Sequence, residues 1–313
     1  MTKARTAAIA LLAAAATAAS ADDQIFVGGP AGAVYVADSD TGEFTYFACF
    51  CIGPIVSIQP LGSDLLVADS FGGLWQLDGV TGVFETGVWT GLQLVDMVVD
   101  GDDALVVTNS GELKRVSLDS GFPTETIPTP EPASSVATFD GRTYVGTTLG
   151  GVFSSDDNLE WGLTRYMTAS IKTLSPRPEG LIIVDSAGQA SVFDWLSGPD
   201  TGYYVSPDTV DAAYTGNFNL FTQAPGAVDV FAADTLLLVD TWTLPVEASA
   251  IFVRPGNVCK ADTNRNGVLE AGDFSAWVAA YNRGDFIADQ NNDLAVTPAD
   301  FSAWVSAFNL GCD

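Results

Sequence analysis

The stretch QIFVGGPAGAVYVADSDTGEF (residues 24–44) returns 40 residues later as DLLVADSFGGLWQLDGVTGVF (residues 64–84), and the two copies align without a gap. Each copy consists of an apolar run, a short turn rich in Gly, Asp or Ser, and a second run, which is the pattern of a β-hairpin. A third copy, DALVVTNSGELKRVSLDSGF, begins at Asp103, and looser copies begin at Arg142, Gly180 and Asn219. The sequence therefore predicts hairpins at a nearly constant interval.

A second recurring element separates the hairpins. It is a short, mainly apolar segment that first appears as IVSIQP (residues 55–60) and last as ASAIFVRP (residues 248–255). Several strands per unit at a period near 39 residues are typical of the blades of a β-propeller. Six copies fill residues 22–257, so we predict an all-β, six-bladed propeller. A β-sandwich with a similar number of strands would not explain a phase that is repeated six times.

The phase of the repeat also predicts how the ring closes. The hairpin that begins at Gln24 has no recurring segment before it, and the last segment, residues 248–255, has no hairpin after it. We therefore expect the C-terminal segment to complete the sheet of the first hairpin. Such closure removes two exposed sheet edges.

One position of the recurring segment carries Ser or Asp in every copy. The innermost strand of a propeller blade lines the central channel, so these side chains are expected to form a ring near one mouth. Asp96 and Asp211 are three copies apart and would face each other across the axis. The ring either holds a cation or polar ligand through its oxygens or is an ordinary hydrated channel wall. The six residues are Ser57, Asp96, Ser135, Ser170, Asp211 and Ser249.

The loops that lead into the recurring segments carry aromatic residues, namely Phe50, Trp89, Tyr166 and Tyr204. Exposed rings beside acidic groups suit a glycan, although core packing accounts for aromatic residues equally well. The chain has no histidine, which removes the commonest general base, the Ser-His-Asp triad and most zinc sites. Acid/base catalysis by paired Asp residues remains open. No catalytic residue is assigned, and a binding domain is favoured over an enzyme.

The N-terminal residues and the net charge limit where the protein is expected to be located and which partners it is expected to bind. Lys3 and Arg5 precede an apolar run that closes on Ala19-Ser20-Ala21. This order predicts a signal peptide over residues 1–21 and a secreted protein, extracellular, periplasmic or at the cell surface; a buried Ala-rich helix is the alternative. No later stretch has the apolar length of a membrane span. The formal charge of −27 repels nucleic acid and anionic lipid, so neither is expected as a partner.

The last sixth of the chain repeats a different sequence at an interval of 27 residues: DTNRNGVLEAGDFSAWVAAYN from Asp262 and DQNNDLAVTPADFSAWVSAFN from Asp289. A calcium loop of EF-hand type needs side-chain oxygens at positions 1, 3 and 5, a backbone carbonyl at position 7 and an acidic side chain at position 12. Both copies meet this spacing and predict two Ca²⁺ ions. The ligands are Asp262, Asn264, Asn266, Val268 and Asp273 in the first loop, and Asp289, Asn291, Asp293, Ala295 and Asp300 in the second.

An amphipathic helix is expected after each loop. Phe274, Trp277, Val278 and Tyr281 are spaced i, i+3, i+4 and i+7, which places them on one helical face, and the second copy repeats that face. Two loop–helix units without a leading helix, each loop closed by Asp, resemble the type I dockerin module. The flanking cysteines and the terminal Gly-Cys resemble the GC-ending variety found on secreted bacterial proteins. The resemblance covers residues 257–313 only.

The resemblance implies a calcium-filled module that binds a cohesin-like protein on a partner or scaffold, largely through loop positions 10 and 11. Those positions hold Ala271-Gly272 and Pro298-Ala299 rather than the Ser-Thr pair common in cellulosomal members, which leaves the partner open. Leu294 replaces the Gly expected at position 6 of the second loop, where a positive φ is needed, and leaves open whether that loop is filled.

The four cysteines suggest two disulfides in an exported protein. Because dockerin termini usually adjoin, the resemblance implies a bond between Cys259 and Cys312. Cys49 and Cys51 are separated by one residue and form either a strained short-range disulfide or two buried thiols.

The sequence thus predicts a signal peptide (1–21), a propeller (22–257) and a dockerin-like module (258–313). The favoured function is a secreted calcium-binding protein whose tail docks a propeller binding domain to a partner or scaffold. The alternative is a polysaccharide-active enzyme, a glycoside hydrolase or lyase, carried on the propeller.

Overall fold

The computed structural model describes residues 23–38, 42–49, 53–62, 64–79, 81–139, 141–156, 160–177, 180–194, 198–215, 218–224, 226–233, 236–254, 261, 263, 269–283, 288, 290 and 296–310. The chain divides into two compact units, with the boundary between Arg254 and Pro255. The first unit is built from strands and the second contains two helices, α2 (Ala271–Arg283) and α3 (Pro298–Leu310). Within the described part of the chain, neither helix has the length and apolar character needed to cross a membrane.

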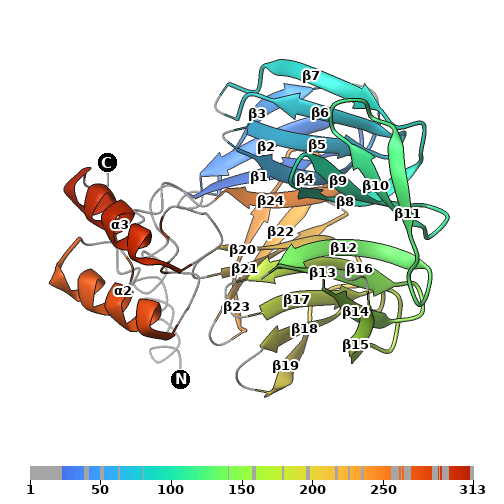
Figure 1. Cartoon of the computed structure of the whole chain (residues 1–313). Helices are drawn as coiled ribbons and strands as arrows, with labels where there is room; N and C mark the ends of the chain where they lie inside the picture. Colours follow the sequence, from blue (N-terminus) through green and yellow to red (C-terminus); the bar gives the residue numbers. More distant parts are fainter. Residues whose placement is uncertain are drawn as a thin grey trace, which may run out of the picture. The chain divides into compact units, whose positions relative to one another are not determined.

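The first unit is a six-bladed β-propeller, as predicted, and each blade is a four-stranded antiparallel sheet (Figure 1). Blade 1 contains β4 (Ile55–Leu61), β5 (Asp64–Asp69), β6 (Gly73–Leu77) and β7 (Phe84–Trp89). Blade 2 contains β8 (Leu94–Asp100), β9 (Asp103–Thr108), β10 (Leu113–Ser117) and β11 (Pro123–Ile127). Blade 3 contains β12 (Ala133–Phe139), β13 (Arg142–Thr147), β14 (Gly151–Ser155) and β15 (Trp161–Tyr166).

The remaining blades follow the same order from the inside outward. Blade 4 contains β16 (Ile171–Arg177), β17 (Gly180–Asp185), β18 (Gln189–Asp194) and β19 (Gly198–Tyr204). Blade 5 contains β20 (Thr209–Thr215), β21 (Phe218–Gln223), β22 (Ala227–Ala232) and β23 (Leu238–Thr243). Blade 6 contains β24 (Ala250–Arg254), β1 (Gln24–Gly28), β2 (Ala33–Asp38) and β3 (Phe44–Cys49).

The ring closes as the phase of the repeat predicted. The last strand, β24, pairs antiparallel with the first, β1, and brings Phe252 opposite Phe26 (Figure 1). The inner strand of each blade also contacts the inner strands of both neighbouring blades, so the six form a closed ring. At the junction of blades 6 and 1, a Cβ on Gly28 would lie 2.5 Å from the Ile55 side chain, so only glycine allows this approach.

The second strand of each blade is buried on both faces, which explains why it reads as an unbroken apolar run. In β5, Leu65 and Val67 pack in a cluster with Phe26 of blade 6, whereas Leu66 and Ala68 pack in a cluster with Met97 of blade 2. Successive residues of a strand point to opposite faces. One apolar strand therefore contributes to the cores on both of its sides, and the propeller is held together mainly by these interblade layers.

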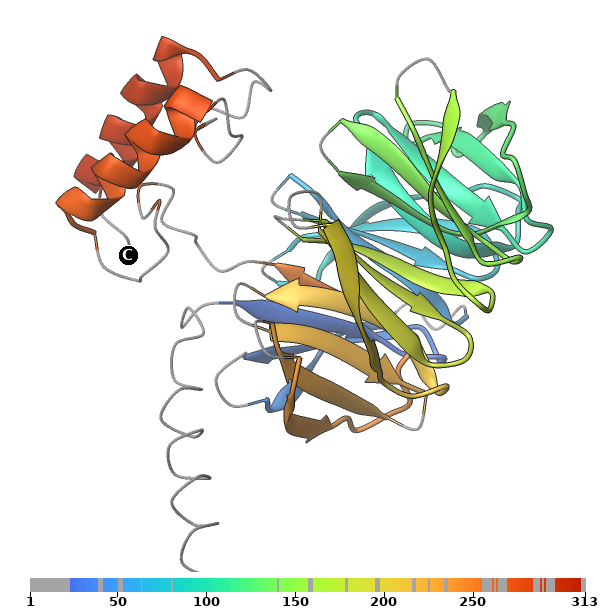
Figure 2. The same ribbon diagram turned by 90° about the horizontal axis from the view of Figure 1, so that it is seen from below.

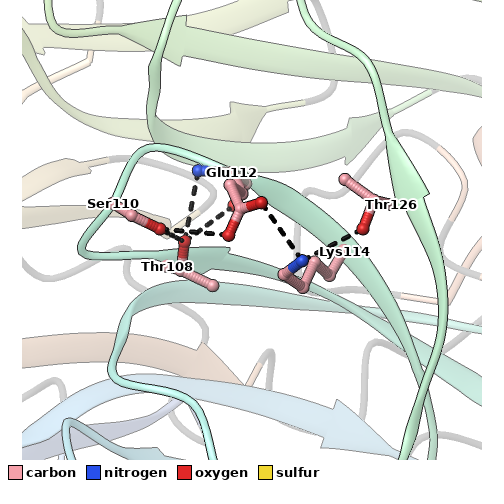
Figure 3. A network of polar contacts seen from close by, with 5 residues as sticks. All are labelled: Thr108, Ser110, Glu112, Lys114 and Thr126. Atoms are coloured by element: carbon pink, nitrogen blue, oxygen red, sulfur yellow. Dashed lines mark hydrogen bonds and ion pairs between the residues drawn. The ribbon is translucent and has the colours of Figure 1, made fainter.

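Polar side chains at the ends of the second strands organise the turns that follow. Asp69 is buried, and its carboxylate accepts hydrogen bonds from Phe71 N (2.8 Å), Gly73 N (3.1 Å) and Trp75 Nε1 (2.8 Å). Thr108 takes this place in blade 2, where its hydroxyl accepts from Glu112 N at 3.2 Å. Figure 3 shows how Lys114 extends that network by donating to Glu112 (3.3 Å) and to Thr126 on the outer strand (3.0 Å).

The two helices of the second unit lie side by side and contact each other reciprocally (Figures 1 and 2). The Phe274 ring is 5.4 Å from that of Trp304, and the Phe301 ring is 5.5 Å from that of Trp277. Trp277 Nε1 donates to the carbonyl of Ala288, and Trp304 Nε1 to that of Ala261, both at 3.2 Å. Each partner is displaced by the 27 residues of the repeat, so the two copies form equivalent halves of one small core.

Candidate functional site

In blades 1 to 5, the ring position lies at a bulge near the start of the inner strand. The strand pairing shifts between residues 55 and 57 in blade 1, and at the equivalent place in blades 2 to 5. The residue that follows the shift is Ser57, Asp96, Ser135, Thr173 or Asp211. In blade 6, Ala250 pairs with Gly28 as Ser57 pairs with Ala68, so Ala250 holds the sixth position.

Two of the six predicted members, Ser170 and Ser249, are out of register with this position. Ser170 lies just before β16, and the ring position of blade 4 belongs to Thr173, three residues later. Ser249 precedes the ring position by one residue, and its hydroxyl donates to the carbonyl of Gly28 at 3.1 Å. Ser135 does hold the ring position, but its fully buried hydroxyl lies against Gly146 rather than in the channel.

Asp96, Thr173 and Asp211 form the neck of the channel, since these three residues line two separate cavities. One cavity, of about 200 Å³, is lined by all six blades and extends toward Tyr214 and Phe252. The other, of about 120 Å³, reaches the mouth at the start of the inner strands and is lined by Lys172 and Ser249 as well. Both are smaller than the roughly 300–1,000 Å³ of typical ligand pockets, so a polysaccharide would not fit at the neck.

Asp96 joins blade 2 to blade 3. Its Oδ1 accepts a hydrogen bond from Met97 N at 2.7 Å, and its Oδ2 accepts one from Val136 N of the neighbouring blade at 2.9 Å. Burial, with a smaller contribution from the negative charge of Asp211, raises the pKa of Asp96 to about 8, against the opposing effect of these hydrogen bonds. This carboxyl group is therefore protonated in neutral solution.

Asp211 makes the corresponding contacts between blade 5 and blade 6. Its Oδ1 accepts from Thr173 Oγ1 at 2.6 Å and from Ala212 N at 2.8 Å, while its Oδ2 accepts from Ile251 N at 2.9 Å. Burial raises the pKa of Asp211 to about 6, and these three donors limit the rise by stabilising the carboxylate. The two facing acids thus have separated pKa values and carry about one negative charge between them at pH 7.

Exposed aromatic side chains lie at the same end of the blades as the smaller cavity. Trp89, Tyr166 and Tyr204 end the outermost strands of blades 1, 3 and 4, and they are 50%, 57% and 59% exposed. Phe71, in the turn between β5 and β6, is exposed at the same end of the blades. Three of the four predicted aromatic residues therefore lie on one face, and Phe50 falls outside the described residues.

The predicted calcium loops are described only in part. Asp273 and Asp300, at position 12 of each loop, are fully buried in the first turns of α2 and α3. The Oδ2 of Asp300 accepts from Thr297 N at 2.7 Å, and its Oδ1 accepts from Gln290 N at 2.9 Å; Asp273 accepts from Glu270 N at 2.8 Å. The eight other predicted ligands lie outside the described residues, namely Asp262, Asn264, Asn266, Val268, Asp289, Asn291, Asp293 and Ala295.

The predicted disulfides also stay predictions. Cys51, Cys259 and Cys312 lie outside the described residues, and of Cys49 only the backbone, at the end of β3, is described.

The structure brings together an acidic group that the sequence did not indicate. Oxygens of Asp64, Asp78 and Glu85, from three different parts of blade 1, lie within 4.8 Å of one another. Gln76 Nε2 donates to Asp64 at 2.7 Å and to Glu85 at 2.9 Å, and the guanidinium of Arg254 faces the two aspartates. These donors account for the cluster as part of the blade surface.

No protein-family model matches the chain, and no curated protein matches its sequence. Solved structures match its fold. A chain of the crystal structure of a nidogen/laminin complex aligns with a TM-score of 0.64 at 11% identity, covering 74% of this chain and 98% of that one. The β-propeller domain of Cps50 (Swd1) from Myceliophteria thermophila aligns with a TM-score of 0.55 at 13% identity, covering 74% and 89%. At these identities the comparisons establish the propeller fold.

Proposed function

We propose that this protein is a secreted adaptor in which a calcium-dependent docking module carries a propeller interaction domain to a partner or scaffold. The observation that carries the proposal is the duplicated tail, in which a buried carboxylate begins each helix and the two helices pack reciprocally. Residues 1–21 would direct export, and the tail would dock a cohesin-like protein.

The buried carboxylates fit a calcium site better than an ordinary helix cap. Thr297 and Asp300 form a capping pair, since Asp300 Oδ2 accepts from Thr297 N, and this pair alone would be stable at the surface. Both Asp273 and Asp300 are instead fully buried, and a buried carboxylate is favoured where a cation supplies positive charge beside it. Calcium bound by Asp262, Asn264, Asn266, Val268 and Asp273, and by the equivalent residues of the second loop, would supply that charge.

Hydrogen exchange measured by mass spectrometry on the full chain tests the calcium assignment, because peptides of the two units are resolved separately. Chelator is expected to abolish protection in residues 269–283 and 296–310 and to leave the propeller strands unchanged. Asp300→Asn should weaken calcium binding by about tenfold or more, since it removes an acidic ligand. Asp119→Asn, on the exposed turn of blade 2, is the matched control and should bind calcium as the wild type does. A tail whose protection is indifferent to both chelator and Asp300→Asn contradicts the proposal.

A glycan is the ligand class that the exposed face of the propeller favours. Trp89, Tyr166 and Tyr204 present half-exposed rings at equivalent strand ends, and such rings stack on the apolar faces of sugars. The acidic surface favours neutral or cationic glycans over sulfated or uronic ones. A glycan array probed with the full chain tests this, with Trp89→Ala and Tyr204→Ala expected to lose the signal. Phe122→Ala, an exposed ring in the turn between β10 and β11, is the control.

A further inference from the structure

The six junctions between blades are joined by different kinds of hydrogen bond. Junction 1/2 has Ser57 Oγ donating to Met97 O at 2.9 Å, and junction 3/4 has Ser134 Oγ donating to Ile171 O at 2.7 Å. Junction 4/5 has Lys172 Nζ donating to Pro207 O, and junction 6/1 has Arg254 donating to Gly79 O, both at 2.6 Å. At these four junctions a side chain donates to a backbone carbonyl.

Junctions 2/3 and 5/6 reverse this arrangement, because there a carboxyl group accepts from the backbone of the next blade. Asp96 Oδ2 accepts from Val136 N, and Asp211 Oδ2 accepts from Ile251 N, each at 2.9 Å. These two junctions are three blades apart. They divide the ring into one half made of blades 6, 1 and 2 and another made of blades 3, 4 and 5.

Each half contributes one of the two acids, and the carboxyl group of that acid accepts a hydrogen bond from the other half. Asp96 belongs to blade 2 and holds blade 3, whereas Asp211 belongs to blade 5 and holds blade 6. Repulsion between the two carboxylates is therefore repulsion between the two halves. We propose that Asp96 and Asp211 form a proton-controlled latch that holds the two three-blade halves of the propeller together.

The other charged groups of the inner strands do not neutralise this pair. Asp100 pairs with Arg115, Arg177 lies over the Tyr214 ring, and Arg254 reaches Gly79, all at the opposite ends of their strands. Lys172 alone shares a cavity with both acids, and its Nζ also donates to the carbonyls of Pro207 and Thr209. The inner strands β4 and β12 place no charged side chain in either cavity among the described residues.

The cavities on both sides of the neck explain how the latch would open. In neutral solution Asp96 keeps its proton, and the pair carries one negative charge. As the pH rises through 8, the Asp96 proton leaves to solvent, two facing carboxylates remain, and water enters from the two cavities to solvate them. We expect the two latch junctions to loosen first, because there the carboxyl groups accept directly from the backbone of the next blade. Asp211 also accepts from the Thr173 hydroxyl across junction 4/5, which is a contact between side chains.

Hydrogen exchange of the full chain at pH 6.5 and pH 8.5, corrected for the intrinsic rates of unstructured peptides, tests the latch. The strands that flank the latch junctions are β8, β12, β20 and β24. The protection factors of their amides should fall by up to about tenfold per pH unit. Strands β4 and β16 also touch the acids through Ser57 and Thr173, so the third strands of blades 1 and 3, β6 and β14, serve as internal references. An equal loss in these four strands and in the references, or no loss in any, overturns the proposal.

Variants distinguish the effect of the Asp96 proton from the effect of the hydrogen bonds across the junctions. Asp96→Asn keeps one side-chain acceptor but does not titrate, so its six inner strands should respond to pH alike. Ser134→Ala removes the neutral bond of junction 3/4 and should keep the wild-type response in β8, β12, β20 and β24. If Asp96→Asn fails to fold, Asp211→Asn applies the same test from the other half. A wild-type response that survives in the folded Asn variant refutes the latch.

Discussion

The free energy of unfolding of the propeller should fall as the pH rises from 6 to 8. The pKa of Asp96 is about 8 in the folded protein, against 3.8 as its ordinary value, so between these values the folded protein holds a proton that the unfolded chain releases. A group whose pKa is raised by folding contributes stability that is present in acid and is lost as the pH rises through the folded pKa. No histidine contributes to the slope between pH 6 and pH 8, because the chain has none of this side chain, which ordinarily titrates in that range.

The magnitude follows from linkage. One proton difference changes the free energy of unfolding by about 1.4 kcal/mol per pH unit, so Asp96 accounts for a fall of up to about 3 kcal/mol between pH 6 and pH 8. Asp211, whose folded pKa is about 6, adds to the slope below pH 6 and little above it. Urea titrations at a series of pH values, followed by the far-ultraviolet circular dichroism of the strands, measure this slope.

The Asp96→Asn variant provides the comparison. It loses one of the two acceptors that hold Met97 N and Val136 N, which should cost about 1 kcal/mol at pH 6. Its unfolding free energy should then stay nearly constant up to pH 8, where it should equal or exceed that of the wild type. A wild-type stability that is flat between pH 6 and pH 8, or a slope that persists in Asp96→Asn, refutes the assignment of a buried proton to this residue.

Two further predictions concern turns. Leu236 has a positive φ of 55° at the place where the equivalent turns of blades 1 and 2 carry Gly82 and Gly121. Leu236→Gly should therefore raise the free energy of unfolding by roughly 1 kcal/mol, whereas Gly82→Ala should lower it. Urea denaturation measures both changes, and a Leu236→Gly variant that is less stable than the wild type would show that Leu236 is not strained. Asp69→Ala leaves three buried or half-buried N–H groups without their acceptor and should lower the free energy of unfolding by about 3 kcal/mol. Asp119→Ala, on an exposed turn, should change it little. Equal thermal midpoints for the two variants would exclude a role of Asp69 in holding its turn.

The number of blades and the closure of the ring were predictable because both depend on backbone pairing that repeats along the chain. Gln24 begins a hairpin with no inner strand before it, and β24 supplies that strand. Side-chain identity was a poorer guide to register. The segment of blade 4 was aligned on Ser170, but the bulge and the apolar residue that follows it place Thr173 in the neck. A strand is positioned by its pairing partners and buried face, and a surface hydroxyl contributes little to that choice.

Features that depend on contacts between distant blades were beyond sequence reasoning. The facing of Asp96 and Asp211 followed from the count of six blades, but their bonds to Val136 and Ile251 require the spacing of neighbouring inner strands. The cluster of Asp64, Asp78 and Glu85 forms because three strands of one sheet end together, and no motif in the sequence marks it. In the tail, the repeat indicated two equivalent units, and the reciprocal tryptophan bonds show how those units pack.

The choice of residue at the neck argues that charge has a role there beyond holding blades together. Serine, threonine and alanine occupy this position in the other four blades, and the ring closes through them without a buried acid. A buried carboxyl group is less favourable than a hydroxyl at the same place unless its charge or its proton is used. If the two acids served stability alone, replacing both Asp96 and Asp211 by Thr would lower the free energy of unfolding by the same amount at pH 6 and at pH 8. Linkage predicts instead that the double replacement gains stability relative to the wild type as the pH rises, which ties the two acids to the response of the propeller to protons.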